Sequence, residues 1–245
     1  MSAAAIVATI PSERQAGTSY DITRDRAGAL ACSCPAFSHS TDTPPWCKHL
    51  AQFDIAGLSS ADAIPLHTFT GRQIFPLAPR LEDIALEDIA HGLSLLCRFG
   101  GQLRSFYSVA EHSVRVSQLC DPADALHGLL HDASEAYLVD IPRPLKHLPV
   151  MDPYRRAEAV LQAAIYRRFA LRRGTPASVT RADEAIAVNE GQDLFAIVPA
   201  WAAAGTRVNK LETLAGWTPL QAERLFLARY HALRRRARAW VDSST

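Results

Sequence analysis

The segment HGLLHDASEAYLVD, which begins at His127, sets imidazoles and carboxylates beside an apolar helical face. Burying an unpaired charge is costly, so polar groups in such a setting need a partner. On one helix over 123–136, His127, His131 and Glu135 share a face because they lie four residues apart, and Asp132 is turned by about 100° from His131. Imidazole and carboxylate together suit Zn, Mn, Fe, Co or Ni. His131 and Asp132 are therefore predicted to form half of a metal site.

Two further polar residues in apolar settings are candidates for the other half. His112 lies in SVAEHSVRVS and Asp183 in TRADEAIAVNE, both segments with a helical spacing of apolar residues. A second imidazole and another carboxylate from neighbouring helices would complete a five- or six-coordinate shell. A single mid-helix His is more often structural, so the prediction depends on the ordered set of all four residues.

A second candidate site lies in CSCPAFSHSTDTPPWCKHL. Cys32 and Cys34 form a CxC pair, and after twelve intervening residues Cys47 and His49 form a CxH pair. Ligands in two close pairs can form a tetrahedron around Zn²⁺, at about 2.0–2.3 Å. Clustered cysteines of this kind indicate metal ligation rather than a disulfide framework. His39 lies within the loop and fits the spacing less well.

The elements that must hold these residues are mostly helical. Apolar residues recur with helical periodicity in six segments, and these segments cover residues 84–99, 107–120, 122–137, 153–169, 177–195 and 219–236. Upstream, we expect a small β-hairpin around Gly28 and a short helix over 46–57. Neither GxGxxG nor GxxxxGK[ST] occurs in the sequence, which argues against a Rossmann or P-loop nucleotide site.

Composition sets the domain plan and the class of protein. A chain of 245 residues with 48% hydrophobic content can bury one core and carry a small extra module. We expect a disordered N-terminus over 1–19, a zinc finger over 20–56, a linker over 57–66 and a helical body over 67–240. Cys97 and Cys120 lie in apolar stretches and are expected to be core residues.

Charge and hydropathy indicate a cytoplasmic protein without membrane contact. The 26 basic and 25 acidic residues give a net charge of +1, so the chain as a whole has no electrostatic attraction to nucleic acid or acidic lipid. No apolar run approaches the roughly 18 residues that a bilayer span requires, and the N-terminal segment lacks the basic start of a secretion signal.

The cysteine-rich segment resembles a SWIM zinc finger over residues 20–55. The shared features are CxC followed by Pro-Ala-Phe, a variable loop, and CxH within Lys-His-Leu. The resemblance implies a structural zinc held by the two pairs, and DNA or protein as the partner of the finger. Only Arg24, Arg26 and Lys48 supply cations nearby, which is little for a nucleic-acid groove. Alternatively, the zinc serves only to fold a segment too small to be stable alone.

The order H…HD…D resembles the HD superfamily of metal-dependent phosphohydrolases over residues 67–235. The similarity extends to TFTGRQIFPLAP, IALEDIAHGLSLLCRFGG, FYSVAEHSV, LLHDASEAYLVDIPRPLK and WTPLQAERLFLARY, and it points to a group that acts on deoxynucleotides, as 5′-deoxynucleotidases and dATP triphosphohydrolases do. The resemblance implies an HD-type helical bundle whose principal metal is held by His112, His131, Asp132 and Asp183.

The same resemblance assigns roles to the residues around the metal. Glu135 would position or deprotonate the attacking water or bind a second metal, and Asp140 would assist it. Arg98 would contact a phosphate, with Arg143 and Lys146 as secondary substrate contacts, and Gly100 and Gly101 would let the backbone approach the nucleotide. The alternative for Arg98 is a salt bridge to Glu87 or Asp88.

The implied function is hydrolysis of a dNMP or dNTP with Mn, Co, Mg, Fe or Zn as the divalent metal. One alternative is a nucleic-acid or protein binding module with an inactive helical scaffold, against which the complete set of ligands argues. Another is an HD hydrolase of a cyclic or alarmone signalling nucleotide. The fusion to a zinc finger departs from the family pattern, so the cellular role stays open. A homo-oligomeric state stays open as well.

Overall fold

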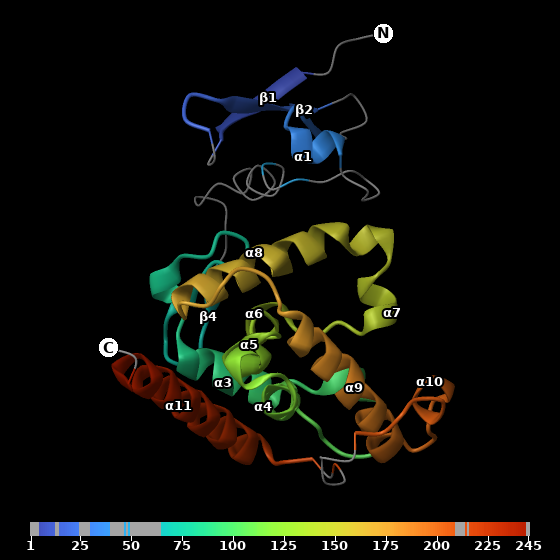
Figure 1. The fold of residues 1–245 in the computed structure, drawn as a ribbon. Helices are drawn as coiled ribbons and strands as arrows, with labels where there is room; N and C mark the ends of the chain where they lie inside the picture. The colour runs from blue at the N-terminus through green and yellow to red at the C-terminus, as the bar shows by residue number, and fades with distance from the viewer. Residues whose placement is uncertain are drawn as a thin grey trace. The chain divides into compact units, whose positions relative to one another are not determined.

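The computed structural model divides the chain into two compact units, residues 1–64 and 65–245. It describes residues 5–12, 15–24, 30–39, 47, 49, 65–208, 214 and 216–243 (Figure 1). The division falls inside the predicted linker. Residues 57–64 of that linker lie outside the described part, and Leu66 already belongs to strand β4 of the second unit.

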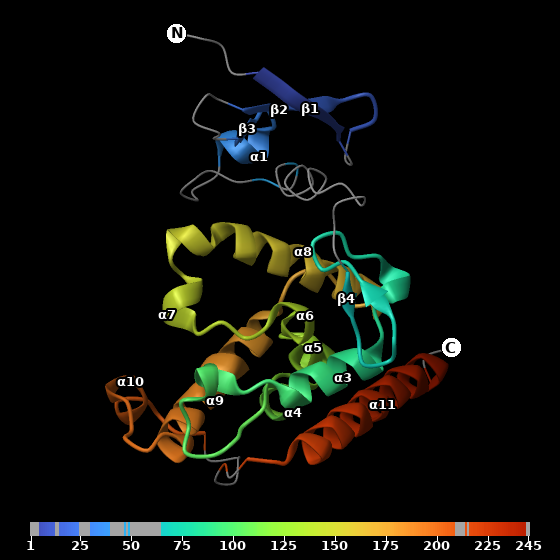
Figure 2. The ribbon, with the colours of Figure 1, turned by 180° about the vertical axis from the view of Figure 1, so that it is seen from behind.

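The N-terminal unit is a three-stranded antiparallel sheet followed by one helical turn (Figure 2). Its strands are β1 (Ala5–Pro11), β2 (Ser19–Arg24) and β3 (Leu30–Cys32), and the turn is α1 (Pro35–Ser38). Strands β2 and β3 pair antiparallel, as the predicted hairpin requires. The helix predicted over 46–57 lies outside the described residues, apart from Cys47 and His49.

The expectation that residues 1–19 are disordered is wrong for β1. This strand pairs with β2 from Ala5 opposite Arg24 to Pro11 opposite Ser19. Residues 1–19 are rich in Ala and Ser, but AIVATIP contains Ile, Val and Thr, the β-branched residues that favour strand structure. Pairing with β2 then satisfies the backbone groups that a free segment would leave to water.

The C-terminal unit is mainly helical, and five long helices match five of the six predicted segments. They are α3 (Leu86–Leu95), α4 (Val109–Leu119), α8 (Asp152–Arg168), α9 (Ala177–Leu194) and α11 (Pro219–Ser243). The shorter elements are β4 (Leu66–His67), β5 (Gln73–Ile74), η1 (Leu81–Asp83), η2 (Arg98–Gly101), η3 (Pro122–Asp124), α7 (Arg143–Lys146), η4 (Pro149–Met151) and α10 (Ala200–Ala203).

The sixth predicted helix, over 122–137, is interrupted. Helix α5 (Ala125–Leu130) ends before His131, and α6 (Glu135–Leu138) begins after a stretch of turns. The side chain of Gln162 on α8 explains the break, because its Nε2 donates to the carbonyl oxygen of Leu130 at 2.7 Å and its Oε1 accepts from the backbone N–H of Ser134 at 3.0 Å. These two backbone groups are satisfied across the core rather than by helix continuation.

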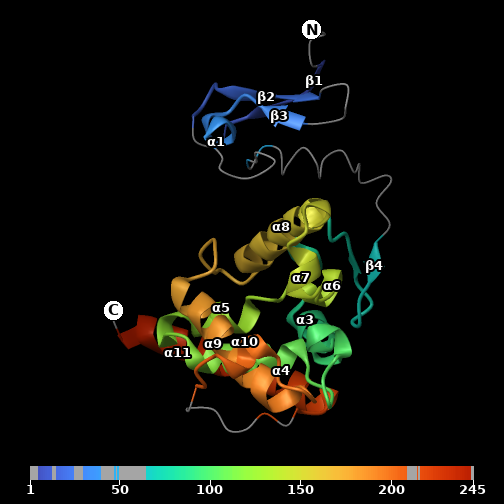
Figure 3. The ribbon, with the colours of Figure 1, turned by 90° about the vertical axis from the view of Figure 1, so that its right-hand side faces the viewer.

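Helix α4 lies at the centre of the unit and contacts α3, α5, α9 and α11. Figure 2 shows α11 running beside α3 and α4, and Figure 3 shows α10 lying beside α9. The core between these helices includes Ile89, Val114, Leu129, Ile186 and Phe226, all nearly or fully buried. None of the described helices combines the length and apolar character that crossing a membrane would require.

Gly128 allows the close approach of α5 to α4. A Cβ at this position would lie 2.8 Å from Sγ of Cys120 and 3.0 Å from Cα of Ser117. We expect Gly128→Ala to lower the free energy of unfolding by about 1–3 kcal/mol, measured in urea. Replacing Cys120 by Ala in the same background should restore only part of this loss, because the contact with the Ser117 backbone remains. A Gly128→Ala variant as stable as the parent would contradict the packing described.

Candidate metal centres

Four polar side chains from three places in the sequence converge in the C-terminal unit. Nε2 of His112, on α4, lies 3.3 Å from Nε2 of His131, 3.6 Å from Oδ2 of Asp132 and 3.1 Å from Oδ1 of Asp183, on α9. Nε2 of His131 lies 3.1 Å from Oδ2 of Asp132 and 4.0 Å from Oδ1 of Asp183. The ligand atoms of His112, His131 and Asp132 form one group that could hold a metal, and Asp183 adjoins it through the two imidazoles. The structure thus brings the four predicted residues together.

The hydrogen bonds behind the two imidazoles fix their tautomers. Nδ1 of His131 lies 2.9 Å from the carbonyl oxygen of Gly128, which can only accept, so Nδ1 carries the proton. Nδ1 of His112 lies 2.6 Å from Oε1 of Glu190 and donates in the same way. In the neutral ring each Nε2 then presents its lone pair to the centre, as metal-binding histidines do.

The charges around the centre also suit a cation. Burial raises the pKa of Asp132, but His131 outweighs it and holds this pKa well below its usual value. Burial also raises the pKa of Asp183, but the hydrogen bond and charge of His112 outweigh burial and lower this pKa to about 2. Burial lowers the pKa of His112, yet the carboxylates of Glu190 and Asp183 raise it to about 9. Ionised carboxylates thus surround an imidazole that takes up a proton. A divalent cation would satisfy this donor set and replace that proton.

Glu190 belongs to the site, although it is not among the residues predicted from the sequence. Its side chain is fully buried, and while Oε1 accepts from His112, Oε2 accepts from Nε and Nη2 of Arg98 at 3.3 and 3.1 Å. Burial raises the pKa of Glu190, but the charges of Arg98 and His112 outweigh burial, so the pKa is lower than usual and the carboxylate is ionised. Glu190 follows Asp183 by seven residues on α9, which is two helical turns along one face. That spacing was the available signal.

Removing the charge of Glu190 should weaken metal binding. We expect Glu190→Gln to reduce the affinity for Mn²⁺ by roughly 10–100-fold, because His112 would lose the acceptor that fixes its tautomer and orientation. Isothermal titration calorimetry measures this affinity. The matched control is Glu184→Gln, an exposed residue on the same helix, which should leave it unchanged. Equal affinities in the two variants would rule out this supporting role.

Arg98 lies at the edge of the centre and pairs with residues other than the predicted alternatives. Its Nη1 lies 3.7 Å from Oδ2 of Asp132, beside the bonds to Glu190. Asp88 is not its partner, because that carboxylate accepts from the backbone N–H and hydroxyl of Thr70 at 2.8 and 2.9 Å. Phe99 follows Arg98 with a φ of 54°, a left-handed conformation that costs about 1–3 kcal/mol in a residue other than glycine. The hydrogen bonds to Glu190 and the ion pair with Asp132 hold the guanidinium of Arg98 against the site.

The remaining predicted residues surround the centre at different depths. Arg143 is exposed, with Nη2 3.8 Å from Oδ2 of Asp183. Glu135 is buried, and burial together with the charges of Asp132 and Asp140 raises its pKa well above the usual value. Burial also raises the pKa of Asp140, opposed by Arg98.

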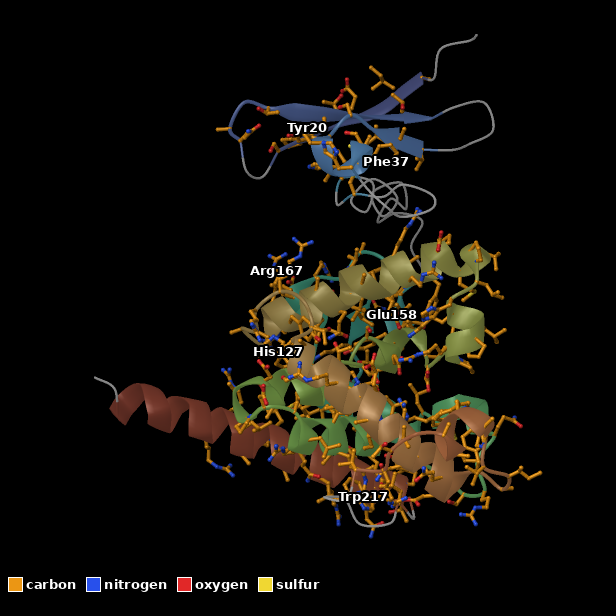
Figure 4. All side chains as sticks on the ribbon, turned by 45° about the vertical axis from the view of Figure 1, so that its right-hand side comes forward. Tyr20, Phe37, His127, Glu158, Arg167 and Trp217 are labelled. Atoms are coloured by element: carbon orange, nitrogen blue, oxygen red, sulfur yellow. The ribbon has the colours of Figure 1, made fainter. Side chains whose placement is uncertain are left out.

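Lys146 and His127 have partners outside the metal group. Lys146, predicted as a substrate contact, lies with Nζ 3.2 Å from Oε1 of Glu135 and 2.6 Å from Oε1 of Glu158. His127 lies with Nε2 3.1 Å from the carbonyl oxygen of Arg172. Figure 4 shows His127 and Glu158 in different parts of the unit. His127 is therefore not part of the metal group.

The N-terminal unit holds the second predicted group. Cys32, Cys34, Cys47 and His49 are all buried, and their ligand atoms lie within 4.8 Å of one another. Sγ of Cys32 is 3.8 Å from Nδ1 of His49. Tyr20 and Phe37, labelled in Figure 4, pack against this cluster.

The chemistry of the N-terminal group also fits a cation. None of the five cysteines, all of which the structure describes, forms a disulfide. Burial, reinforced by the neighbouring thiols of Cys47 and Cys34, raises the pKa of Cys32 to about 12. Adjacent buried thiolates are stable only beside a positive ion, and three sulfurs with one imidazole are ligands that zinc prefers. The group could hold zinc. Of the two cysteines expected in the core, Cys120 is buried, whereas Cys97 is exposed.

Fold and sites together define a mainly α protein with a small N-terminal antiparallel sheet, a Cys₃His group and a His₂Asp group that could each hold a metal. The chain is 40% identical over 129 residues to the uncharacterized protein YfdR of Escherichia coli, and the match covers 53% of this chain and 71% of the relative. It is 34% identical over 168 residues to the uncharacterized protein RCAP_rcc00048 of Rhodobacter capsulatus, covering 64% and 76%. The chain belongs to the family of these two proteins, whose names carry no activity. No family model matches it.

Proposed function

We propose that this protein is a divalent-metal-dependent phosphohydrolase, and that its substrates are deoxynucleoside mono- or triphosphates. The observation that carries the proposal is the convergence of two imidazoles and two carboxylates on one point, with the guanidinium of Arg98 beside them. The H…HD…D order and its flanking segments support an HD-type helical bundle. Deoxynucleotides as substrates are supported by that resemblance alone.

The residues that would hold the cation are His112 and His131, through Nε2, and the carboxylates of Asp132 and Asp183. A divalent cation supplies a lowered pKa for an attacking water and neutralises charge on phosphoryl oxygens. Arg98 presents a planar, permanently charged guanidinium that can donate to phosphate oxygens. With the cation bound, these groups would draw negative charge from the phosphoryl oxygens and so favour attack of water on phosphorus.

Glu135 is the residue proposed to accept or donate a proton. Its Oε1 accepts from Lys146, while Oε2 is buried and has no hydrogen-bond partner in the part of the chain that the structure describes. An unpartnered buried oxygen is unfavourable in a purely structural residue. Oε2 is therefore the atom that would hold or release the proton of the attacking water.

The N-terminal unit is proposed to fold around a structural zinc and to contact DNA or protein. The buried Cys₃His group supports the zinc, and the SWIM resemblance supports the partner. A gel shift with duplex and single-stranded DNA tests the nucleic-acid arm. If the N-terminal unit contacts DNA, we expect the DNA to migrate more slowly in the presence of the protein, and we expect this shift to disappear after the zinc is removed.

The activity is tested by incubating the full chain with each dNMP and dNTP and the corresponding ribonucleotides, in Mn²⁺, Co²⁺ or Mg²⁺. Free phosphate and the remaining nucleotide are measured by malachite green and HPLC. We expect phosphate or polyphosphate release from deoxynucleotides that stops with EDTA. Turnover confined to a cyclic or alarmone nucleotide would favour the signalling alternative, and no turnover of any substrate would reject the proposal.

A further inference from the structure

Three charged side chains form a compact buried cluster next to the metal group. Nζ of Lys146 lies between Oε1 of Glu135, at 3.2 Å, and Oε1 of Glu158, at 2.6 Å. The side chains of Glu135, Lys146 and Glu158 are only 6%, 19% and 19% exposed. They come from α6, α7 and α8. Such a cluster must overcome a large desolvation cost, so buried ion pairs are weak evidence of stability and often serve to fix a geometry.

Helix α8 anchors the segment that carries Glu135 and Lys146 at a second point. The hydroxyl of Tyr154 donates to the carbonyl oxygens of Leu138 and Val139 at 2.8 and 2.7 Å, and its ring lies 5.9 Å from Nζ of Lys146. Val139 has a φ of 64°, which the fold must hold against its preference. The backbone between Glu135 and Lys146 is thus held by α8 independently of the ion pairs.

The function described so far uses Glu135 and leaves Glu158 without a role. We propose that Glu158 and Lys146 are positioning residues for the hydrolysis: Glu158 fixes the ammonium of Lys146, and Lys146 fixes Oε1 of Glu135. Oε2 is then the one oxygen of that carboxyl group without a partner among the described residues. This inference rests on the proposed function. It also makes Lys146 a support of Glu135 rather than a contact of the substrate.

The first test separates positioning from substrate binding and from general stability. We expect Glu158→Gln to lower kcat roughly tenfold with KM nearly unchanged, the loss typical of a supporting partner. In a Glu135→Gln background the same substitution should cause no further loss, because the two residues act as one unit. A raised KM with an unchanged kcat would make Lys146 a substrate ligand, and independent losses would make Glu158 merely structural. Either result overturns the proposal.

The control is Asp124→Asn, which removes a comparable carboxylate. The side chain of Asp124 is 15% exposed and binds Arg172 at 2.7 Å, away from the metal group. We expect it to alter stability and to leave kcat at the parental value. A tenfold fall in kcat in this variant as well would show that the effect of Glu158→Gln is not specific, which again overturns the proposal.

The second test does not depend on turnover. Lys146→Met leaves two buried carboxylates without their cation, and we expect its Tm to fall by roughly 10 °C. The triple variant Glu135→Gln, Lys146→Met, Glu158→Gln should recover most of that loss, because no charge is left uncompensated. Without a fall and recovery the cluster does not exist in solution, and the inference fails even if the chain hydrolyses nucleotides. If the melting pattern holds but the parent hydrolyses no substrate, the positioning role falls with the proposed function while the ion-pair cluster stands.

Discussion

Asp132→Ala is expected to reduce phosphate release by about 10³-fold or more. Oδ2 of Asp132 lies within 3.1 Å of His131 Nε2 and 3.6 Å of His112 Nε2, and it also faces Arg98. Its removal takes away a ligand and the charge that binds the cation. A bound cation stabilises the transition state by several kcal/mol. Because each step of about 1.4 kcal/mol in activation free energy changes the rate tenfold, losing the cation would cause a loss of this size.

Two matched variants make the result interpretable. Asp121→Ala removes an exposed carboxylate from the same unit and should leave both metal content and turnover unchanged. Asp132→Asn keeps the shape of the side chain without its charge, so we expect a loss of turnover close to that of Asp132→Ala. Parental turnover in Asp132→Ala with added Mn²⁺ would place the chemistry elsewhere.

Cys32→Ser is expected to unfold the N-terminal unit and leave the C-terminal unit folded. Among the described residues of the N-terminal unit, the buried hydrophobic cluster is Ile22 and the three cysteines of the metal group, so this part of the unit has little apolar core apart from the proposed ligands. Zinc binding to such a site supplies about 10–16 kcal/mol of folding free energy. Because the two units are compact by themselves, the melting transition of the helical unit should persist.

Zinc content and amide exchange measure this outcome together. The parent should contain one zinc per chain that Cys32→Ser lacks, and the amides of β1, β2 and β3 should lose protection only in the variant. The control is Cys97→Ser, which changes an exposed thiol outside the group. A Cys32→Ser protein that retains both its zinc and the protection of the sheet would show that Cys32 is not a ligand.

Local periodicity was sufficient for the long helices and insufficient for the break at His131. Apolar spacing predicts one helix over 123–136, because each position in it is compatible with a helix. The interruption depends on Gln162, a residue about thirty positions later on another helix, which takes over the backbone groups of Leu130 and Ser134. A tertiary contact of this kind leaves no signal in the local pattern.

The candidate site shows the same division between local and distant information. His131 and Asp132 stand out because they are adjacent polar residues in an apolar segment. Glu190 and Glu158 do not, since a glutamate in a helix is ordinarily a solvated residue. Their roles appear only when α8 and α9 lie against the segments that carry Lys146 and His112. Likewise, the β-branched residues of β1 favour a strand, but its partner strand β2 is known only from the tertiary structure.

A crystal structure of the full chain, grown with Mn²⁺ and measured at the manganese absorption edge, would locate the bound cation. We expect one anomalous peak in the C-terminal unit, bonded to Nε2 of His112, Nε2 of His131 and carboxylate oxygens of Asp132 and Asp183. A peak bonded to other residues, or no peak in that unit at saturating Mn²⁺, would rule out this metal site.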